Sequence, residues 1–434
     1  MRLLNPVTVL MLFCILFSRS MQSQVATSGN EAANMPAPAA KSGSTVFNAT
    51  DFGAVADGVT DDTAAIQTTM ERCAGKAAPL NGCVLYFPAG VYMTTGLSLK
   101  SFMHIKGDGW GTSVIQLMPH TAADVLTVPI DAFNFSIHGL TIDGNRSKGG
   151  TGNCFSTAAT PTSPAKFNVA NKETASMNPQ KWGHIEEVIF SNCSADGIHI
   201  NAFNYMLYFD NFYAFNNGMY GLYTEGTNSG FSNFQIERNG TAGIHAAGSS
   251  NRFTSGEVIW NGASGNAEAG VYVSGNRNLI TAVETEDNYT NGFFDRGNNN
   301  EFIGCVSDAN GYRRRNPDAS SRIASGFVME GTGGVYVGDK VTSYRDRLPD
   351  GNFATEWPYK MTNVNQSRVD ISYDRTNQPP QAATNPSDDN SPAAPVQAAP
   401  SAPGHAACIK SAGPPVTLGS CSSEIGSSGD CTCN

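Results

Sequence analysis

A repeat of about 22 residues in the middle of the chain is the feature that most limits how this sequence can fold. Each copy begins with a large apolar residue and carries an asparagine eight positions later. These pairs are Phe209 and Asn217, Phe231 and Asn239, Phe253 and Asn261, Ile280 and Asn288, and Phe302 and Asn310. An earlier copy carries Asn192, and successive asparagines are 25, 22, 22, 27 and 22 residues apart. A glycine then opens a strand of alternating apolar residues, at Gly197, Gly221, Gly243, Gly270, Gly292 and Gly326.

This period predicts an all-β chain that forms a right-handed parallel β-helix, with the coil continuing to about Tyr373. One rung of short strands cannot bury its inner face alone, whereas rungs stacked about 4.8 Å apart enclose a continuous core. An asparagine at the same bend of every rung lets each side-chain amide donate to the next amide carbonyl. A leucine-rich repeat requires an L-x-x-L-x-L pattern that is absent, and an antiparallel barrel does not explain the fixed spacing.

The composition agrees with a surface made of turns and strand faces. The 434 residues include 45 Gly and 39 Asn, and only 15% are charged, against about 25% in typical proteins. Hydrophobic residues make up 40% of the chain, which is enough to bury a core. A net charge of -10 would repel phosphate, so we expect no nucleic-acid partner.

The two ends differ in character from the repeat region. We expect a secretory signal peptide at 1–23, a linker at 24–45, the β-helix at 46–375, a Pro- and Ala-rich linker at 376–405 and a disordered, Cys-rich tail at 406–434. The apolar run near the N-terminus is too short for a bilayer, which needs about 20 residues. These features predict a secreted or extracytoplasmic protein without membrane insertion, and they leave its oligomeric state open.

Cysteine usage fits an oxidising compartment. The four tail cysteines favour disulfides, with zinc as the second interpretation. Of ten cysteines, nine remain after the loss of Cys14 with the signal peptide, so at least one thiol is free or bridges to another chain. Cys73 and Cys83 close a short loop and are expected to pair. Cys305 falls at an apolar strand position and is expected to be buried.

The region before the repeats fits a cap for the solenoid. The sequence from Asp51 to Gln67 predicts a strand, a turn at Asp57-Gly58 and a helix that begins after Thr60 as N-cap and ends near Cys73. Such a cap covers the core and the strand edges of an open first rung.

Three motifs in this region carry a family likeness. Asp51-Phe52-Gly53-Ala54, Val84-Leu85-Tyr86-Phe87-Pro88-Ala89-Gly90-Val91-Tyr92 and Ile105-Lys106-Gly107-Asp108-Gly109 resemble the N-terminal region of pectin lyase-like superfamily proteins. That superfamily includes rhamnogalacturonases, polygalacturonases, β-1,3-glucanases and phage tail spikes. The resemblance implies a secreted protein that acts on or binds polysaccharide, but a shared fold does not fix the chemistry.

The catalytic motifs of polygalacturonases are mostly absent. Those motifs are N-T-D-G, then G-D-D and G-H-G on the following rungs. Ser194-Ala195-Asp196-Gly197 matches the first at Asp-Gly alone, Gly218-Met219-Tyr220-Gly221 has no carboxylate pair, and Thr241-Ala242-Gly243 has no histidine. Only Asp196 carries over.

Side chains on the glycine-opened strands alternate between the core and the surface. Five rings are expected to point outward in one column, namely His199, Tyr223, His245, Tyr272 and Phe294. The next outward positions hold Asn201, Glu225, Ala247, Ser274 and Arg296. A stack of rings with polar neighbours suits a sugar, although aromatic ladders also simply stabilise stacked sheets.

From this column we predict Glu225, Asp196, His199 and His245 as catalytic residues. Tyr223, Tyr272, Phe294, Arg296 and Asn201 are the predicted substrate-binding residues. Strand geometry places Asp196 on the order of 15 Å from Glu225, which is too far for a simple carboxylate pair unless the turn curls inward.

Three functions fit this pattern. The first, which the pattern favours over the other two, is a glycoside hydrolase that cleaves a plant or microbial polysaccharide with Glu225 and Asp196 as acid and base, without a cofactor. The second is a lyase or epimerase acting on a uronic-acid polymer, with the histidines, Tyr223 and Arg296 moving protons and offsetting charge, and with Ca²⁺ as a possible cofactor of a lyase. The third is a carbohydrate-binding surface protein without catalysis.

One further motif is the glycine-rich turn from Gly107 to Gly111. A dinucleotide site would need a helix directly after it, but residues 112–117 have the pattern of a strand, so that site is not expected.

Overall fold

The computed structural model describes residues 46–75, 82–158, 180–202, 204–264, 268–311, 324–342, 357–362, 366–374, 407–409 and 418–420. The predicted signal peptide and both predicted linkers lie outside these residues, and so does the predicted Cys-rich tail apart from two short strands. No helix in the described ranges is long and apolar enough to cross a membrane.

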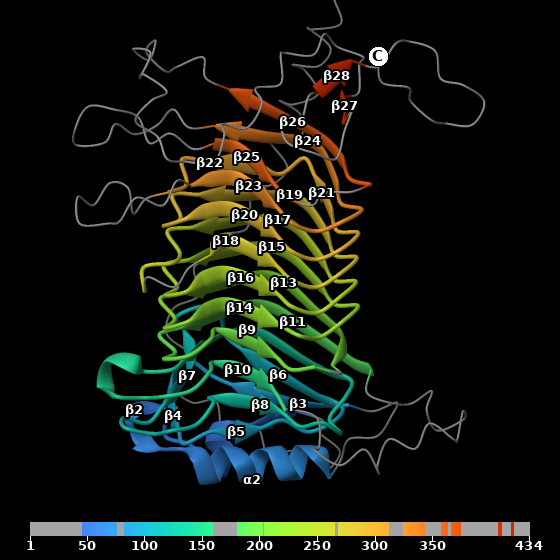
Figure 1. Ribbon diagram of the computed structural model, residues 1–434. Coiled ribbons are helices and arrows are strands. Elements are labelled where there is room, and N and C mark those ends of the chain that lie inside the picture. The colour runs from blue at the N-terminus through green and yellow to red at the C-terminus, as the bar shows by residue number, and fades with distance from the viewer. Residues whose placement is uncertain are drawn as a thin grey trace, which may run out of the picture. The chain divides into compact units, whose positions relative to one another are not determined.

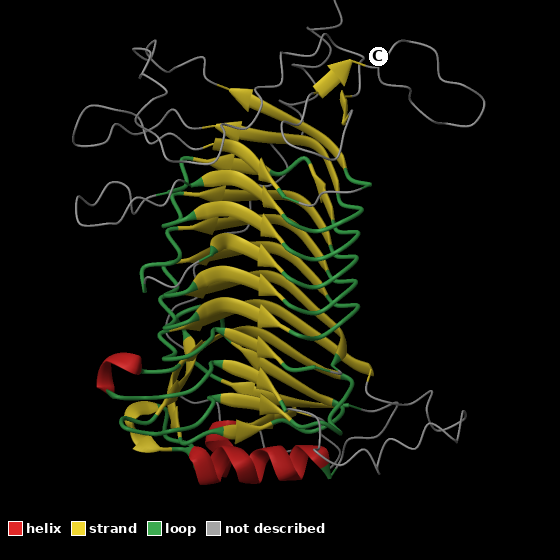
Figure 2. Ribbon diagram, in the orientation of Figure 1, coloured by secondary structure: helices red, strands yellow, loops and turns green. Residues whose placement is uncertain are grey.

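The described chain is a parallel β-helix with a helix at its N-terminal end, as Figures 1 and 2 show. The elements from the N-terminus to the first complete rungs are β1 (Val46–Asn48), η1 (Ala49–Phe52), β2 (Asp57–Asp61), α2 (Thr63–Ala74), β3 (Cys83–Phe87), β4 (Gly90–Thr94), β5 (Leu97–Ser98), β6 (Met103–Gly107), β7 (Ser113–Leu117), β8 (Leu126–Val128), β9 (Phe135–Asp143), η2 (Arg146–Lys148), β10 (Phe155–Thr157), β11 (Gln180–Ser191) and β12 (Ile198–Ile200). The following elements are β13 (Tyr205–Phe215), β14 (Tyr220–Thr224), β15 (Gly230–Glu237), β16 (Ala242–Ala246), β17 (Arg252–Ile259), β18 (Ala269–Val273), β19 (Leu279–Glu286), β20 (Asn291–Asp295), β21 (Glu301–Ile303), β22 (Val306–Asp308), β23 (Ser325–Met329), β24 (Val335–Thr342), β25 (Trp357–Met361), β26 (Arg368–Asp374), β27 (Ala407–Ile409) and β28 (Leu418–Ser420).

The rungs build two parallel sheets from these elements. The long-strand sheet runs from β1 through β9, β11, β13, β15, β17 and β19 to β24, and the short-strand sheet runs from β5 through β12, β14, β16, β18, β20 and β23 to β25. The predicted rung starts lie in register, because Phe209 pairs with Phe231 and Phe231 pairs with Phe253. Their rings stack in the core with centroids 5.3 and 4.9 Å apart. One repeat of the sequence therefore corresponds to one turn of the coil.

Buried asparagines hold successive rungs together at one turn. Asn239 Oδ1 accepts hydrogen bonds from the backbone N–H and from Nδ2 of Asn217, both at 3.0 Å. Asn261 Oδ1 accepts the same pair of bonds from Asn239, at 3.0 and 2.9 Å. Asn288 and Asn310 continue the pattern. The predicted ladder is therefore confirmed from Asn217 onward.

Asn192 is not a member of this ladder. Its Nδ2 donates to Asp143 Oδ2 at 2.6 Å, and the backbone N–H of Cys193 donates to Asn217 Oδ1 at 3.0 Å. The ladder position on that rung is held by Cys193, which is disulfide-bonded to Cys154. A second ladder, which the sequence analysis did not predict, joins Asn251, Asn278 and Asn300 at another turn.

The N-terminal cap is confirmed, but its start differs from the prediction. The N-cap residue is Asp62 rather than Thr60; the Asp62 side chain makes no cap hydrogen bond, and the Asp61 carboxylate accepts the backbone N–H of Thr63. Thr60 lies in β2, where its backbone N–H and hydroxyl donate to the Asp57 carboxylate. The Asp62 carboxylate instead accepts the backbone N–H groups of Val55 and Ala56. Thr60 therefore does not serve as the N-cap, because its backbone N–H and its hydroxyl are bonded to Asp57 in the turn before the helix.

The described cysteines behave as expected, with one addition. Cys73 and Cys83 form the predicted disulfide, which ties α2 to β3. Cys305 has no disulfide partner and is buried. The disulfide between Cys154 and Cys193 was not predicted.

Candidate functional site

The outer face of the short-strand sheet carries the predicted column of rings. In strands β12, β14, β16, β18 and β20 the inward residues are fully or almost fully buried, namely Ile198, Leu222, Ile244, Val271 and Phe293. The outward residues pair in register from one strand to the next. The ring centroids of His199 and Tyr223 lie 4.9 Å apart, those of Tyr223 and His245 5.1 Å, and those of His245 and Tyr272 4.4 Å.

Asp196 and His199 form an ion pair at the first rung of this column. His199 Nδ1 lies 2.6 Å from Asp196 Oδ2, and Asp196 Oδ1 accepts the backbone N–H of Tyr220 at 2.9 Å. Burial acts to lower the pKa of His199, but the hydrogen bond to Asp196 and the charge of Asp196 outweigh it, so the pKa lies above its ordinary value. The structure thus brings Asp196 to a histidine, where sequence reasoning had paired it with Glu225.

Tyr223 and Glu225 form the second polar pair. The Tyr223 hydroxyl donates to Glu225 Oε1 at 2.9 Å, and Glu225 Oε2 accepts the backbone N–H of Ala202 at 3.3 Å. Burial, followed by the bond to Glu225, raises the pKa of Tyr223. Glu225 itself is exposed to solvent, so its carboxylate can exchange protons with water.

His245 lies on the other side of Tyr223, and its pKa is shifted in the opposite direction from that of His199. Burial lowers the pKa of His245 to about 4, against a smaller opposing effect of Glu225. Its Nε2 lies 3.0 Å from Ser274 Oγ, while Nδ1 is buried without a hydrogen-bond partner. At neutral pH the imidazole ring is therefore uncharged and able to accept a proton.

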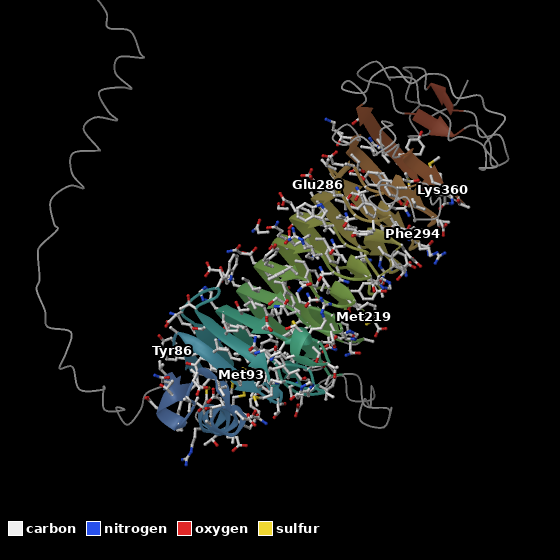
Figure 3. The ribbon with its side chains drawn as sticks, turned by 90° about the vertical axis from the view of Figure 1, so that its left-hand side faces the viewer. Tyr86, Met93, Met219, Glu286, Phe294 and Lys360 are labelled. Atoms are coloured by element: carbon white, nitrogen blue, oxygen red, sulfur yellow. A yellow bond between two sulfur atoms is a disulfide. The ribbon has the colours of Figure 1, made fainter. Side chains whose placement is uncertain are left out.

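At the far end of the column, Phe294 is more buried than predicted. Phe294, labelled in Figure 3, points outward, but it is only 8% exposed because it packs with Ala269, Val328 and Tyr272 and lies beneath Arg296. The Arg296 guanidinium lies 5.2 Å from the Phe294 ring and pairs with Glu330 at 3.0 Å. Phe294 thus supports this surface, and the exposed Arg296 is the side chain that can meet a ligand.

Asn201 is turned back toward the preceding rung. Its Nδ2 donates to the carbonyl oxygen of Thr157 at 2.6 Å, and its side chain also hydrogen-bonds to His199. It therefore helps to fix His199 in place more than it offers a free amide to a ligand.

Tyr220 belongs to the same cluster and was missed by the sequence analysis. Its ring centroid lies 5.5 Å from that of Tyr223 and 5.3 Å from that of His245. Burial is the largest cause that raises the pKa of Tyr220, and the charge of Asp196 adds to it. The sequence contained a signal for this residue, because Tyr220 is an aromatic residue directly before Gly221, the glycine that opens the strand, and two positions before the inward residue Leu222.

The predicted absence of a cofactor, with Ca²⁺ as a possible cofactor of a lyase, stays a prediction. Among the described residues, no group of three or more His, Cys, Asp or Glu side chains is placed to hold a metal ion.

Comparison with curated proteins finds similarity to enzymes of Azotobacter vinelandii. The mannuronan C5-epimerase AlgE2 is 40% identical over 113 residues, which cover 23% of this chain and 11% of the relative. Alginate lyase 7 of the same organism is 37% identical over 114 residues, which cover 23% of this chain and 13% of that relative. The chain therefore spans little more than a tenth of the length of these curated relatives.

Comparison with solved structures and with family models gives the fold and the family. The A-module of the A. vinelandii mannuronan C5-epimerase AlgE4 has a TM-score of 0.51 at 18% identity and covers 75% of this chain and 97% of its own. The full-length tailspike protein 2 of an Escherichia coli O157:H7 bacteriophage has a TM-score of 0.59 at 15% identity, over 75% of this chain and 42% of its own. The family model "Rhamnogalacturonase A/epimerase, pectate lyase-like" matches residues 46–292, more than half of the sequence. This chain belongs to the rhamnogalacturonase A/epimerase family of pectate lyase-like proteins.

Proposed function

We propose that the column of rings removes the C5 proton of a uronic acid unit in a polysaccharide, which is the step shared by uronate epimerases and lyases. One observation carries the proposal. His199, paired with Asp196, favours a positive charge, whereas His245 is uncharged, and the Tyr223 hydroxyl lies on the rung between them.

These charge states match what the reaction needs. A C5 proton becomes acidic only when the neighbouring carboxylate is neutralised, and the His199 imidazolium supplies that positive charge. The uncharged His245 ring accepts the proton through Nε2, because Nδ1 is buried. Arg296, exposed further along the column, offers a second cation to the carboxylate of another sugar unit.

The outcome depends on where the next proton goes. When C5 is reprotonated from the opposite face of the ring, the sugar is inverted. When the C4–O bond breaks instead, the leaving oxygen takes a proton and an unsaturated sugar remains. Tyr223, whose hydroxyl is hydrogen-bonded to the exposed Glu225, is the proton donor in this proposal, and Glu225 returns a proton to it from solvent.

A glycoside hydrolase with Asp196 and Glu225 as acid and base has less support. Hydrolysis requires two carboxyl groups that reach the glycosidic bond or a water. Both oxygens of the buried Asp196 carboxylate are already occupied, by His199 and by the backbone N–H of Tyr220. Glu225 alone leaves the pair incomplete.

The comparisons point in the same direction. The family description includes epimerases, and the curated relatives named above are a mannuronan C5-epimerase and an alginate lyase. We therefore include a polyuronate as the substrate class in the proposal. Two disulfides in the described chain add support for an extracytoplasmic location.

The test is incubation of the purified chain with mannuronan, guluronan and polygalacturonate, with three readouts. We expect inversion at C5, seen by NMR, or an unsaturated product, seen by ultraviolet absorbance, on at least one polymer. Tyr223→Phe and His245→Gln should each lower the rate by about 10²- to 10⁴-fold, the usual contribution of an acid–base group. Trp182→Ala, an exposed position in β11, is the control and should leave the rate unchanged. New reducing ends without unsaturation would contradict the proposal and favour hydrolysis.

A further inference from the structure

The glycine-rich turn from Gly107 to Gly111 has no part in the site proposed above. Between β6 and β7 it presents Trp110, whose side chain is 43% exposed. The turn is fixed on both sides of the tryptophan, since the Gly109 N–H donates to the carbonyl oxygen of Gly139 at 2.8 Å and the Gly111 N–H donates to Thr141 Oγ1 at 3.1 Å.

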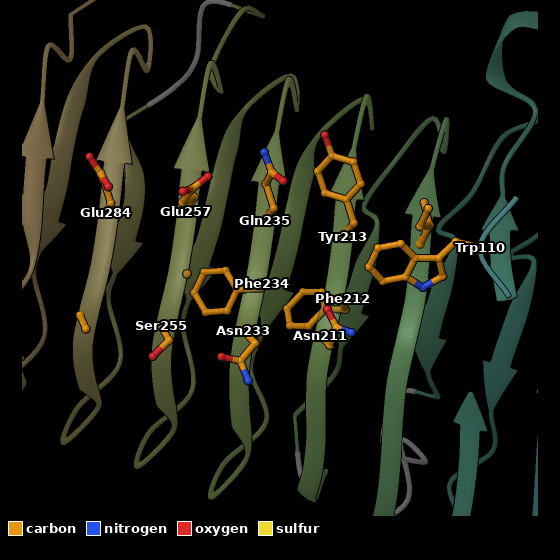
Figure 4. Close-up of a pocket in the computed structure, with 13 residues that line it drawn as sticks. Trp110, Asn211, Phe212, Tyr213, Asn233, Phe234, Gln235, Ser255, Glu257 and Glu284 are labelled. Atoms are coloured by element: carbon orange, nitrogen blue, oxygen red, sulfur yellow. The ribbon is translucent and has the colours of Figure 1, made fainter. Parts of the chain in front are cut away.

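Trp110 lines a hollow on the outer face of the long-strand sheet (Figure 4). This hollow, here called the tryptophan groove, has a volume of about 700 Å³ and crosses β11, β13, β15, β17 and β19. Its lining combines Trp110 with the rings of Phe212 and Phe234 and with polar side chains from successive rungs.

The backbone explains why a hollow forms here. Each long strand bends at a residue with positive φ, and in β13, β15, β17 and β19 these residues are Asn211, Asn233, Ser255 and Ala282. Beside this bend, the Phe234 ring packs directly against Gly256, where a Cβ atom would lie 2.1 Å from the ring. Phe212 and Phe234 line the hollow next to the bend.

The polar side chains of the groove repeat with the rungs. Tyr213 pairs in register with Gln235, Gln235 with Glu257, and Glu257 with Glu284. Figure 4 shows these four side chains in one row. Successive members are about 4.8 Å apart. The Tyr213 side chain is already hydrogen-bonded to Glu237, so Gln235 and Glu257 are the members that offer hydrogen-bonding groups to a ligand lying along the solenoid. The exposed Asn233 and Ser255 form a second polar row beside it.

This chemistry suits an uncharged sugar chain. The face of an indole packs against the C–H face of a pyranose ring, and amide, hydroxyl and carboxylate groups bind sugar hydroxyls. The lining contains two glutamates and no Lys, Arg or His. A polyuronate, whose carboxylates would face those glutamates, is therefore disfavoured on this face. The column of rings differs, because it contains His199 and Arg296, each paired with a carboxylate.

We propose that the tryptophan groove is a second carbohydrate-binding site, which takes a neutral oligosaccharide with one sugar ring stacked on Trp110. It lies on a different sheet from the column of rings. Binding there needs none of the residues assigned to proton transfer, so the two proposals can fail separately.

The experiment is calorimetric titration of the full chain with neutral hexasaccharides of β-1,4-linked glucose, β-1,3-linked glucose and β-1,4-linked mannose, and with a mannuronate hexasaccharide. We expect at least one neutral sugar to bind, and Trp110→Ala to weaken its affinity at least tenfold. Trp182→Ala, an equally exposed tryptophan outside the groove, should bind as the wild type does. Tyr223→Phe, on the other sheet, should also leave this binding unchanged.

Several results would overturn the proposal. They are a wild-type chain that binds none of the neutral sugars, a Trp110→Ala variant with unchanged affinity, and a Trp182→Ala or Tyr223→Phe variant that loses as much affinity as Trp110→Ala. If Trp110→Ala fails to fold, the exposed Gln235→Ala variant decides the question. A loss of at least threefold in its affinity supports the groove, and an unchanged affinity refutes it.

Discussion

Replacing Asn239 by alanine tests whether the buried asparagine ladder stabilises the coil. The Asn239 side chain makes four hydrogen bonds, to the backbone N–H and Nδ2 of Asn217, to the carbonyl oxygen of Ala214 and to Asn261 Oδ1. Alanine removes all four at a site with no exposed surface. The φ angle of Asn239 is not in the left-handed region, so the backbone accepts alanine without strain.

The size of the expected loss in stability follows from the hydrogen-bonding groups that remain without a partner. Asn217 Nδ2 keeps its bond to the carbonyl oxygen of Phe190, and Asn261 Oδ1 keeps the Asn239 N–H. The backbone N–H of Asn217, however, loses its acceptor in a buried position, at a cost of about 1–3 kcal/mol, and each other lost bond adds about 0.5–1.5 kcal/mol. We expect a loss of about 4 kcal/mol from the free energy of unfolding, a large part of the about 5–15 kcal/mol that a domain has.

The matched control is Asn298→Ala. Asn298 makes the same kind of inter-rung bonds, since its Nδ2 donates to Asn276 Oδ1 and its Oδ1 accepts the backbone N–H and the hydroxyl of Thr332, but it is exposed. Water replaces these bonds, so the expected loss is below about 1 kcal/mol. Urea unfolding followed by circular dichroism, with disulfides intact, measures both variants. Equal losses for the two asparagines, or a loss below about 1 kcal/mol for Asn239→Ala, would refute the reasoning.

Two predictions concern pH. Asp196→Asn removes the charge that raises the pKa of His199, so the fall of activity on the alkaline side should move to lower pH; an unchanged pH profile would show that His199 need not be charged. Burial raises the pKa of Asp339 to about 7 from 3.8, so its protonated form favours folding, and that stability is present at low pH and lost as the pH rises through 7. The difference between 3.8 and about 7 corresponds to about 4 kcal/mol over the whole range from about pH 4 to pH 7, of which about two thirds falls above pH 5. Between pH 5 and pH 8 the unfolding temperature of Asp339→Asn should therefore decrease less than that of the wild type, and equal decreases would contradict this.

The coil could be predicted because residues of the same type recur at the same position of successive rungs. Phe209, Phe231 and Phe253 fill the core at the same place, and Asn217 and Asn239 close the same turn. The second ladder was missed because its members, Asn251, Asn278 and Asn300, have a shorter run of repeats. The disulfide between Cys154 and Cys193 joins residues 39 apart that only the stacking of rungs brings together.

Sequence reasoning predicted which side chains form the column of the candidate site, but not the hydrogen bonds that these side chains make. Alternation along each strand placed His199, Tyr223 and His245 on the surface, because that depends on backbone geometry alone. The pair between Asp196 and His199 depends on how the turn before β12 folds back, and no spacing rule describes that turn. The tryptophan groove was likewise hidden, since the left-handed bend falls on residues as different as Asn233, Ser255 and Ala282.

The most direct test of the central claim follows the C5 proton itself. The chain is incubated with a polyuronate in D₂O, and the C5 proton signal of the sugar units is followed by NMR. The proposed chemistry predicts that this signal disappears, because inversion replaces the proton by deuterium and elimination leaves no hydrogen at C5, and that Tyr223→Phe and His245→Gln preserve it. Shortening of the polymer with every C5 proton retained would contradict the account.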